Sequence, residues 1–422
     1  MTANGSFSHA GPQLLTRRNG IIACVLAFSI GAFIQLSMPL TDLYEVPNVR
    51  GIFFAFVVAT FALRFLSGEP VKAGSSLLMS YFALSFFLAV GISYSRAPIY
   101  GMSKSILVAS YLWALGTVIY NLVDDFRVGK AFLTGLVVGG ILLVGITAAE
   151  FGNPIELIRN SNRFFRLRLG EEGNPIMLAR HLALAFTTIA TFIAVRRKWI
   201  DLIWGVPIGL LICAYLVATG SKGPLLALLT SFVWAPIFLA KRMITRIILI
   251  VLLAAISFTG GIVLLELLPK EFVQERFIDK IQNLSLRLPG YTTAIDAILR
   301  SAPLALVIGH GTGDFGYLEL RSDSRAYPHN IFLEVAYENG VVGLAILLTA
   351  LSIPLLATVR AAQRPLDMAH KALLAGLATS YIAAMINAQF SGDLGANLLI
   401  GMFGAATVSI TRLRANTDLG TA

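Results

Sequence analysis

The chain has 422 residues, of which 56% are hydrophobic and only 13% are charged, whereas a soluble globular domain carries about 25% charged residues. This composition excludes a soluble globular protein, and the long continuous apolar runs exclude a β-barrel, whose strands would alternate. The formal net charge is +10. Because the charges fall in short loops between apolar runs, membrane topology and anionic lipids explain them better than nucleic acid does. We predict an all-α polytopic membrane protein.

The apolar runs predict about twelve membrane-spanning helices. Arg17 and Arg18 precede the first run, which is long enough to be an uncleaved first span rather than a signal peptide. Most short loops on one side are basic, which by the positive-inside rule places both termini in the cytoplasm. The predicted spans lie at about residues 20–38, 51–66, 75–92, 103–122, 131–150, 175–195, 199–218, 224–240, 247–268, 329–357, 371–389 and 394–411.

The spans divide the chain into three regions. Residues 1–268 hold the first nine spans, with an arginine-rich external loop at 151–174. Residues 269–327 form one large external loop, and residues 328–422 hold the last three spans. The two cysteines, Cys24 and Cys213, lie inside apolar runs and suggest neither a disulfide framework nor a metal site.

The loop 151–174 is basic although the topology places it outside. Its segment RNSNRFFRLRLG carries Arg163, Arg166 and Arg168 shortly after Arg159. An arginine side chain binds phosphate or carboxylate through a planar fork of donors. The cluster therefore indicates either a site for an anionic ligand or an anchor to lipid headgroups.

Two further cations stand near the external side. Lys222 lies in the tight turn ATGSKGP, where the N-terminus of the next helix adds positive potential; it binds an anion or extends to the membrane interface. Arg180 and Arg64 are the two charges that we assign to span interiors. Arg180, which His181 follows, lies below the arginine-rich loop. It either extends an anion site inward or packs against a helix carbonyl.

The large external loop is predicted to contain two helices and a glycine-rich turn. The segment PKEFVQERFIDKIQNL has an apolar face that includes Phe272, which suits a helix on the membrane surface. A second helix is predicted near 291–301, with Arg287 just ahead of it. The turn VIGHGTGDFGY, with His310 and Asp314, lacks the strand–helix context of a nucleotide loop, so we expect it to approach a different ligand closely.

His329 and Asn330 follow Pro328 where the chain is predicted to re-enter the membrane. The imidazole is either a proton acceptor or a cap or headgroup contact at the start of the helix. A base beside several phosphate-binding cations suits transfer of a group from a phosphate or diphosphate to a hydroxyl, without a metal ion. The sequence shows neither a pair of acidic residues at glycosidase spacing nor a nucleophile elbow.

Five motifs in order resemble the bacterial O-antigen ligase and O-antigen polymerase superfamily. They are RLRLGEEGNPIMLARHLAL, TGSKGPLLALL, LSLRLPGYTTAIDAI, IGHGTGDFGY and PHNIFLEVAYENGVVGL. The architecture of many spans with one large late loop extends the likeness over most of the chain. One departure is Lys222, which stands where the family commonly has arginine and lacks the two-pronged contact of a guanidinium.

The resemblance implies a glycosyltransferase-C-like fold in the bacterial inner membrane, with its active site on the periplasmic side. It implies transfer of a glycan from a polyprenyl-diphosphate carrier to lipid A core, with polymerisation of glycan repeats on the carrier as the alternative. The family enzymes invert the anomeric centre and need neither metal nor cofactor. The resemblance assigns acceptor activation to His329 and the diphosphate contact to Arg287, with Arg166 or Arg168 as a second contact.

A transporter or flippase for the same lipid-linked glycan is the rival from another functional class. A basic cavity among twelve spans would fit that protein equally well. It would, however, show repeated halves and charges near the middle of the membrane, whereas the charges here collect at one face. The sequence therefore favours the enzyme.

Overall fold

The computed structural model describes residues 12–37, 58–62, 64–66, 68, 70–72, 74–159, 167, 175–196, 198–231, 234, 242–274, 288–397 and 399–412. Within these residues the chain forms helices and no β-strand. The predicted all-α class is therefore confirmed for the part of the chain that the structure describes.

Eight helical stretches in the described part are long and apolar enough to cross a membrane, which confirms a polytopic membrane protein. The apolar helices Asn19–Gly31 and Leu399–Thr411 are shorter. Predicted spans 51–66 and 224–240 lie partly outside the described residues, so the count of twelve stays a prediction. The eight stretches are Ser76–Tyr94, Pro98–Leu122, Phe126–Phe151, Pro175–Arg196, Trp199–Ala218, Met243–Val263, Ile331–Ala362 and Met368–Ala388.

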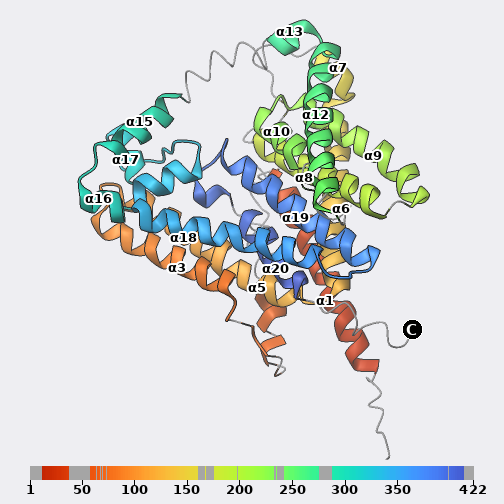
Figure 1. Cartoon of the computed structure of the whole chain (residues 1–422), viewed down its shortest axis with the longest axis horizontal. Helices are drawn as coiled ribbons and strands as arrows, with labels where there is room; N and C mark the ends of the chain where they lie inside the picture. Colours follow the sequence, from red (N-terminus) through yellow and green to blue (C-terminus); the bar gives the residue numbers. More distant parts are fainter. Residues whose placement is uncertain are drawn as a thin grey trace, which may run out of the picture.

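The labels of Figure 1 follow the chain. The N-terminal half contains α1 (Pro12–Ser37), α3 (Ser76–Gly91), α4 (Pro98–Val108), α5 (Leu115–Leu122), α6 (Phe126–Phe151), α7 (Pro154–Arg159), α8 (Pro175–Arg196) and α9 (Trp199–Ala218). The C-terminal half contains α10 (Lys222–Ser231), α12 (Met243–Leu267), α13 (Lys270–Val273), α15 (Leu288–Leu299), α16 (Pro303–Ile308), α17 (Asp314–Leu320), α18 (Ile331–Ala362), α19 (Met368–Ala388) and α20 (Leu399–Thr411). Short turns of other helix types are η2 (Ile92–Tyr94), η3 (Ala109–Ala114) and η7 (Leu394–Ala396).

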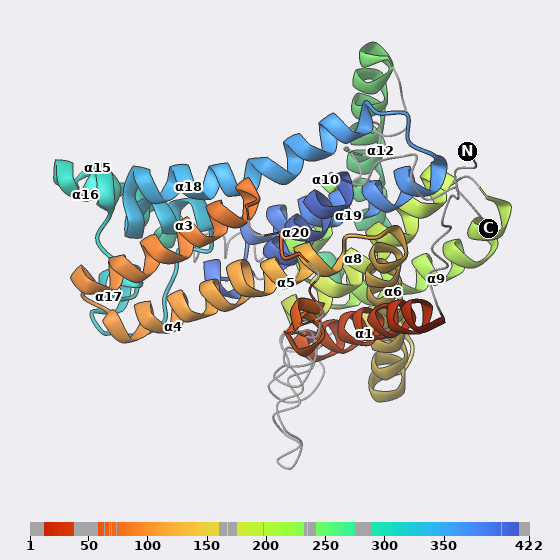
Figure 2. The same cartoon turned by 90° about the horizontal axis from the view of Figure 1, so that it is seen from below.

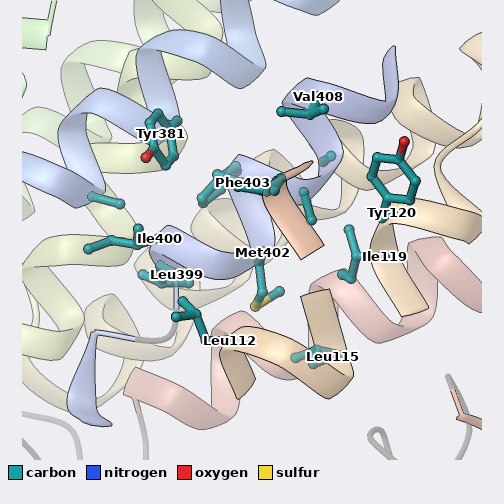
Figure 3. Close-up of a cluster of buried hydrophobic side chains, with 14 of the residues drawn as sticks. Leu112, Leu115, Ile119, Tyr120, Tyr381, Leu399, Ile400, Met402, Phe403 and Val408 are labelled. Carbon is teal, nitrogen blue, oxygen red and sulfur yellow. The ribbon is translucent and has the colours of Figure 1, made fainter. Parts of the chain in front are cut away.

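The short helix α20 lies at the centre of the largest core cluster. Every residue from Leu399 to Thr411 is buried, and Figure 3 shows Met402 on the side of α20 that faces Leu115 and Ile119 of α5. A helix that is apolar on all sides needs neighbours on all sides, and α5, α18 and α19 supply them. This packing explains why α20 is the most enclosed helix although it is short.

The helices form two groups on either side of this centre. Figure 2 shows α3, α4 and α18 running side by side, and in both views α15, α16 and α17 gather at one end of α18 (Figures 1 and 2). The helices α6, α8 and α9 lie on the other side, and α19 packs against α8 (Figure 1). The predicted external helix near 291–301 is found as α15, three residues earlier at its start.

The helix α18 is broken at Gly340, whose backbone has φ 63° and ψ −165°. In an unbroken helix, each carbonyl group accepts a hydrogen bond from the amide four residues later. The break removes these amide donors from the carbonyl groups of Tyr337 and Glu338. The loop 309–313 supplies them, since the His310 amide donates to Tyr337 O at 3.1 Å and the Gly311 amide donates to Glu338 O at 2.8 Å. The first nine residues of α18 are thus attached to the loop 309–313.

Candidate functional site

His329 and Asn330 form the entry to α18. The Asn330 side chain accepts hydrogen bonds from the amides of Phe332 at 3.0 Å and Leu333 at 3.1 Å, which makes it the N-cap of the helix. His329 has a left-handed backbone with φ 58°, a conformation that costs energy for a residue with a side chain. Its ring meets that of Tyr327 edge to face, with 4.6 Å between the centroids. The imidazole is thus held in a strained, specific position beside a tyrosine.

Arg180 is buried in the second turn of α8, with 3% of its surface exposed. Its Nη2 donates to the carbonyl of Ser391 at 2.5 Å, in the loop 389–397 between α19 and α20. The sequence left two roles open for Arg180, and this contact is with a carbonyl, though of a loop rather than of a helix. Arg180 also interacts electrostatically with Tyr327 and Asp393, so it lies near the entry to α18.

The loop 389–397 also borders Lys222 and α15. A Cβ added to Gly223, which directly follows Lys222, would lie 3.3 Å from Cβ of Phe390. The Tyr291 hydroxyl of α15 donates to the Gln389 carbonyl at 3.5 Å. We name this loop, together with its neighbours Arg180, Lys222, Tyr327 and His329, the loop 389–397 site. Three predicted site residues therefore lie around this loop or against its neighbour Tyr327: Arg180, Lys222 and His329.

Asp393 holds the same loop in place. It caps η7 by accepting a hydrogen bond from the amide of Ala396 at 2.9 Å, and it accepts one from the Tyr100 hydroxyl at 2.7 Å. Arg325 Nη2 pairs with it at 3.1 Å. Burial alone would raise the pKa of Asp393, but the charges of Lys104 and Arg325 outweigh it, so that the pKa lies below its usual value. The carboxylate is therefore ionised at neutral pH.

A buried ionic cluster that the sequence analysis missed lies under the first turns of α18. Lys104 Nζ of α4 lies 2.6 Å from Glu334 Oε1 and 2.7 Å from both carboxylate oxygens of Glu338. Glu334 also accepts a hydrogen bond from the Leu394 amide at 3.1 Å. From the sequence, only Arg64 and Arg180 are predicted to lie in span interiors. Two acidic residues four positions apart on an apolar helix were the available signal, since they share one face.

The loop 309–313 approaches the protein's own backbone, which corrects our expectation that its glycines approach a ligand. A Cβ added to Gly309 would lie 2.1 Å from the Glu338 carbonyl oxygen. A Cβ added to Gly311 would lie 2.6 Å from Ser95 Cα, and a Cβ added to Gly313 would lie 2.6 Å from the Gly101 nitrogen. These positions have φ 84°, 104° and 86°, which favour glycine. The loop therefore fastens α18 to the turn between α3 and α4.

His310 and Asp314 belong to this fastening rather than to the loop 389–397 site. His310 Nε2 lies 2.7 Å from Ser301 Oγ, and its ring stacks on Tyr337; burial lowers the pKa of His310. Asp314 accepts from Arg96 Nη2 at 2.6 Å and from the Tyr337 hydroxyl at 2.8 Å. Burial would raise the pKa of Asp314, but these hydrogen bonds lower it below its usual value.

The remaining predicted donor contacts lie outside the described residues. These are Arg163, Arg166, Arg168 and Arg287. Leu288, the residue after Arg287, begins α15, and a Cβ added to Gly290 would lie 3.7 Å from Cα of Pro328. In the described part, no group of three or more His, Cys, Asp or Glu side chains is placed to hold a metal ion.

A family model described as O-antigen ligase matches residues 207–348 of this chain. No curated protein matches it. The match over residues 207–348 supports the resemblance of this chain to the O-antigen ligase and polymerase superfamily.

The part that matches the O-antigen ligase family runs from the middle of α9 into α18. It contains Lys222, the loop 309–313, His329 and the acidic pair Glu334 and Glu338. Arg180, Lys104 and Asp393 lie outside the matched residues but contact or neighbour this part. The site is thus assembled from the O-antigen ligase region and from helices before and after it.

Proposed function

We propose that the chain transfers a glycan from a polyprenyl-diphosphate carrier to a sugar hydroxyl on the periplasmic face of a bacterial inner membrane. One observation carries this proposal. His329 is held in a left-handed backbone conformation at the start of α18, and its ring packs on Tyr327, which interacts electrostatically with Arg180 and Asp393. Strain of this kind is retained where the rest of the fold imposes it, which is common at functional sites.

In the proposed reaction, the imidazole of His329 accepts the proton of the acceptor hydroxyl. The hydroxyl oxygen forms a bond to the anomeric carbon while the bond from that carbon to the diphosphate oxygen breaks. The electron pair leaves with the diphosphate. A single displacement of this kind inverts the anomeric centre, and the chain's own cations can stabilise the leaving group without a metal ion.

The cations proposed to hold the diphosphate rest on two kinds of argument, the place of the residue in the structure and the family resemblance. Lys222 stands at the start of α10 and next to the loop 389–397 site, where the helix N-terminus adds positive potential. Arg287, with Arg166 or Arg168 and with Arg163, is carried over from the family resemblance and the basic loops. Arg180 supports them indirectly, because it is bonded to the Ser391 carbonyl and fixes the loop.

Ligation to lipid A core is the first assignment, because the family model that matches is described as O-antigen ligase. Polymerisation of repeat units on the carrier is the alternative within the same superfamily. Both reactions use the same donor chemistry and differ only in the acceptor. Both termini are proposed to be cytoplasmic, and the fold is proposed to be glycosyltransferase-C-like.

The test is product analysis by mass spectrometry in proteoliposomes that contain a polyprenyl-diphosphate-linked glycan and lipid A core. Glycan on lipid A core identifies a ligase, and longer glycans on the carrier identify a polymerase. His329→Ala should abolish either product in protein that still folds, and Arg287→Ala should chiefly weaken use of the donor. Intact substrate that has crossed the membrane, with no covalent product, would replace the proposal by the flippase alternative.

A further inference from the structure

A large cavity lies between α6, α8, α9 and α19, far from the loop 389–397 site. Its volume is about 700 Å³, within the range of about 300–1,000 Å³ that ligand pockets occupy. Arg196 lines the cavity and ends α8, whereas Arg180 is in the second turn of the same helix. About 24 Å of helix at 1.5 Å per residue separate the two. The cavity is therefore at the opposite end of the bundle.

The lining changes from charged to apolar along each helix. Lys130, Arg196 and Lys198 stand at the ends of the helices, where the sequence predicts the cytoplasm. One or two turns further along, the wall consists of apolar side chains such as Val137 of α6 and Ile189 of α8. A site with cations at one end and an apolar wall beyond them has the polarity of a lipid with an anionic headgroup.

The acidic residues at the mouth do not cancel its positive charge. Asp201 pairs with Arg196 Nε at 3.4 Å, and Asp367 lies 2.5 Å from His370 Nδ1. Lys130 and Lys198 are exposed and make no ion pair with a described residue. Two ammonium groups are therefore available to a ligand phosphate, which attracts lysine as a point charge.

Tryptophan marks the depth of the cavity in the membrane. Trp204 lines the wall and is 66% exposed, and Trp199 at the start of α9 is 76% exposed. Tryptophan side chains concentrate at the boundary between headgroups and hydrocarbon. The mouth with Lys130 and Lys198 thus faces the headgroups, and the apolar wall continues into the hydrocarbon.

We propose that this cavity binds an anionic membrane phospholipid, with its phosphate at Lys130 and Lys198 and an acyl chain along the apolar wall. A soluble phosphate would leave the apolar wall in contact with water. A phospholipid fits the whole cavity, because its phosphate meets the lysines at the mouth and its acyl chain covers the apolar wall. The site is independent of the proposed transfer reaction. It joins α8 and α19, whose other ends border the loop 389–397 site.

The test is native mass spectrometry of the full chain with phosphatidylglycerol or phosphatidylcholine. Wild type should retain phosphatidylglycerol selectively. The double variant Lys130→Gln/Lys198→Gln should bind it about 25-fold more weakly, since each cation near an anionic lipid contributes about fivefold. Thr134 is an exposed residue that lines the cavity, so the larger side chain of Thr134→Trp should occupy the space of the acyl chain. This variant should no longer bind phosphatidylglycerol, although it keeps every cation.

The matched control is Arg127→Gln/Arg360→Gln, which removes two exposed cations at the same end of the bundle but outside the cavity. It should bind phosphatidylglycerol nearly as wild type does. Equal weakening in this control, or equal retention of the two lipids by wild type, would overturn the proposal. Displacement of the lipid by an equal concentration of glycerol 3-phosphate would do so as well, because the headgroup alone would then account for binding. Thermal unfolding in lipid-free detergent checks that each variant is folded.

Discussion

The ammonium group of Lys104 lies 2.6 Å from a carboxylate oxygen of Glu334, and both side chains are only 1% exposed. Glu334 stands five residues after His329 on the same segment, and Lys104 belongs to α4. A buried ion pair of this kind is a weak source of net stability, but it is costly to break. It joins α4 to the part of α18 that begins beside His329.

Replacing Lys104 by methionine should lower the free energy of unfolding by about 3–5 kcal/mol, because Glu334 and Glu338 lose their shared partner. Chemical unfolding in detergent measures this loss. Lys72→Met is the matched control, since Lys72 is half exposed and lies 3.4 Å from Asp124; it should cost less than about 1 kcal/mol. Equal losses in the two variants would contradict a structural role for the buried cluster.

Glycine and alanine at position 329 should separate chemistry from strain. Both variants lose the imidazole, and we expect both to lose glycan transfer. His329→Gly should nevertheless be about 1 kcal/mol more stable than His329→Ala, because φ 58° costs glycine nothing. Unfolding curves and product assays on the same preparations measure the two effects. Transfer that survives in either variant would remove His329 from the reaction.

The close approach of Gly309 to α18 predicts a large loss from one methyl group. In Gly309→Ala the new Cβ would lie 2.1 Å from Glu338 O, so the loop 309–313 must move. Gly152→Ala is the control, since Gly152 has a similar φ of 79° but nothing within 4 Å of its Cβ. Thermal unfolding should show a much lower melting temperature for Gly309→Ala. A loss no greater than that of the control would mean that the loop does not fasten α18.

Asp314 should make the protein sensitive to acid. Its folded-state pKa lies below the unfolded value of 3.8, so its stabilisation is fully present above about pH 4 and is lost as the pH falls through the folded value. Asp314→Asn should therefore be less stable at neutral pH and show a flatter stability profile below pH 4. The free energy of unfolding lost in Asp314→Asn should be smaller than the loss of about 3–5 kcal/mol that follows the breaking of a fully buried ion pair, because Arg96 is half exposed.

The control for this profile is Asp367→Asn. The pKa of Asp367 is also lowered, but its side chain is 42% exposed and its partner His370 lies on the same helix turn. We expect a smaller change in the acid profile from this variant. Melting temperatures between pH 6 and pH 3 compare the two. A steeper profile in Asp314→Asn than in wild type would contradict the assigned ion pair.

Sequence patterns predicted those parts of the fold that depend on neighbouring residues. Pro328 and Asn330 indicated the start of α18, and the apolar runs indicated the spans. The pairing of Lys104 with Glu338 could not be predicted in this way, because the two are 234 residues apart. Glycines at 309 and 311 indicated a close approach, but the same pattern serves a ligand and a neighbouring backbone equally well.

Arg180 shows the same limit within the candidate site. Its burial could be expected from its place in an apolar span. Its partner, the Ser391 carbonyl, lies 211 residues away in the chain, and no periodicity links the two. The packing of α19 against α8, rather than a local pattern, decides what the guanidinium meets.

The break at Gly340 divides α18 into two segments that are held differently. Ile331 and Val335 before the break and Leu347 and Leu351 after it all pack in the central core, and the earlier segment is also bound by Lys104 and the loop 309–313. Because the hydrogen-bond ladder is interrupted, we expect a change in bilayer thickness to tilt the later segment more than the earlier one. The entry to α18 at His329 should then keep its position when the thickness of the membrane changes.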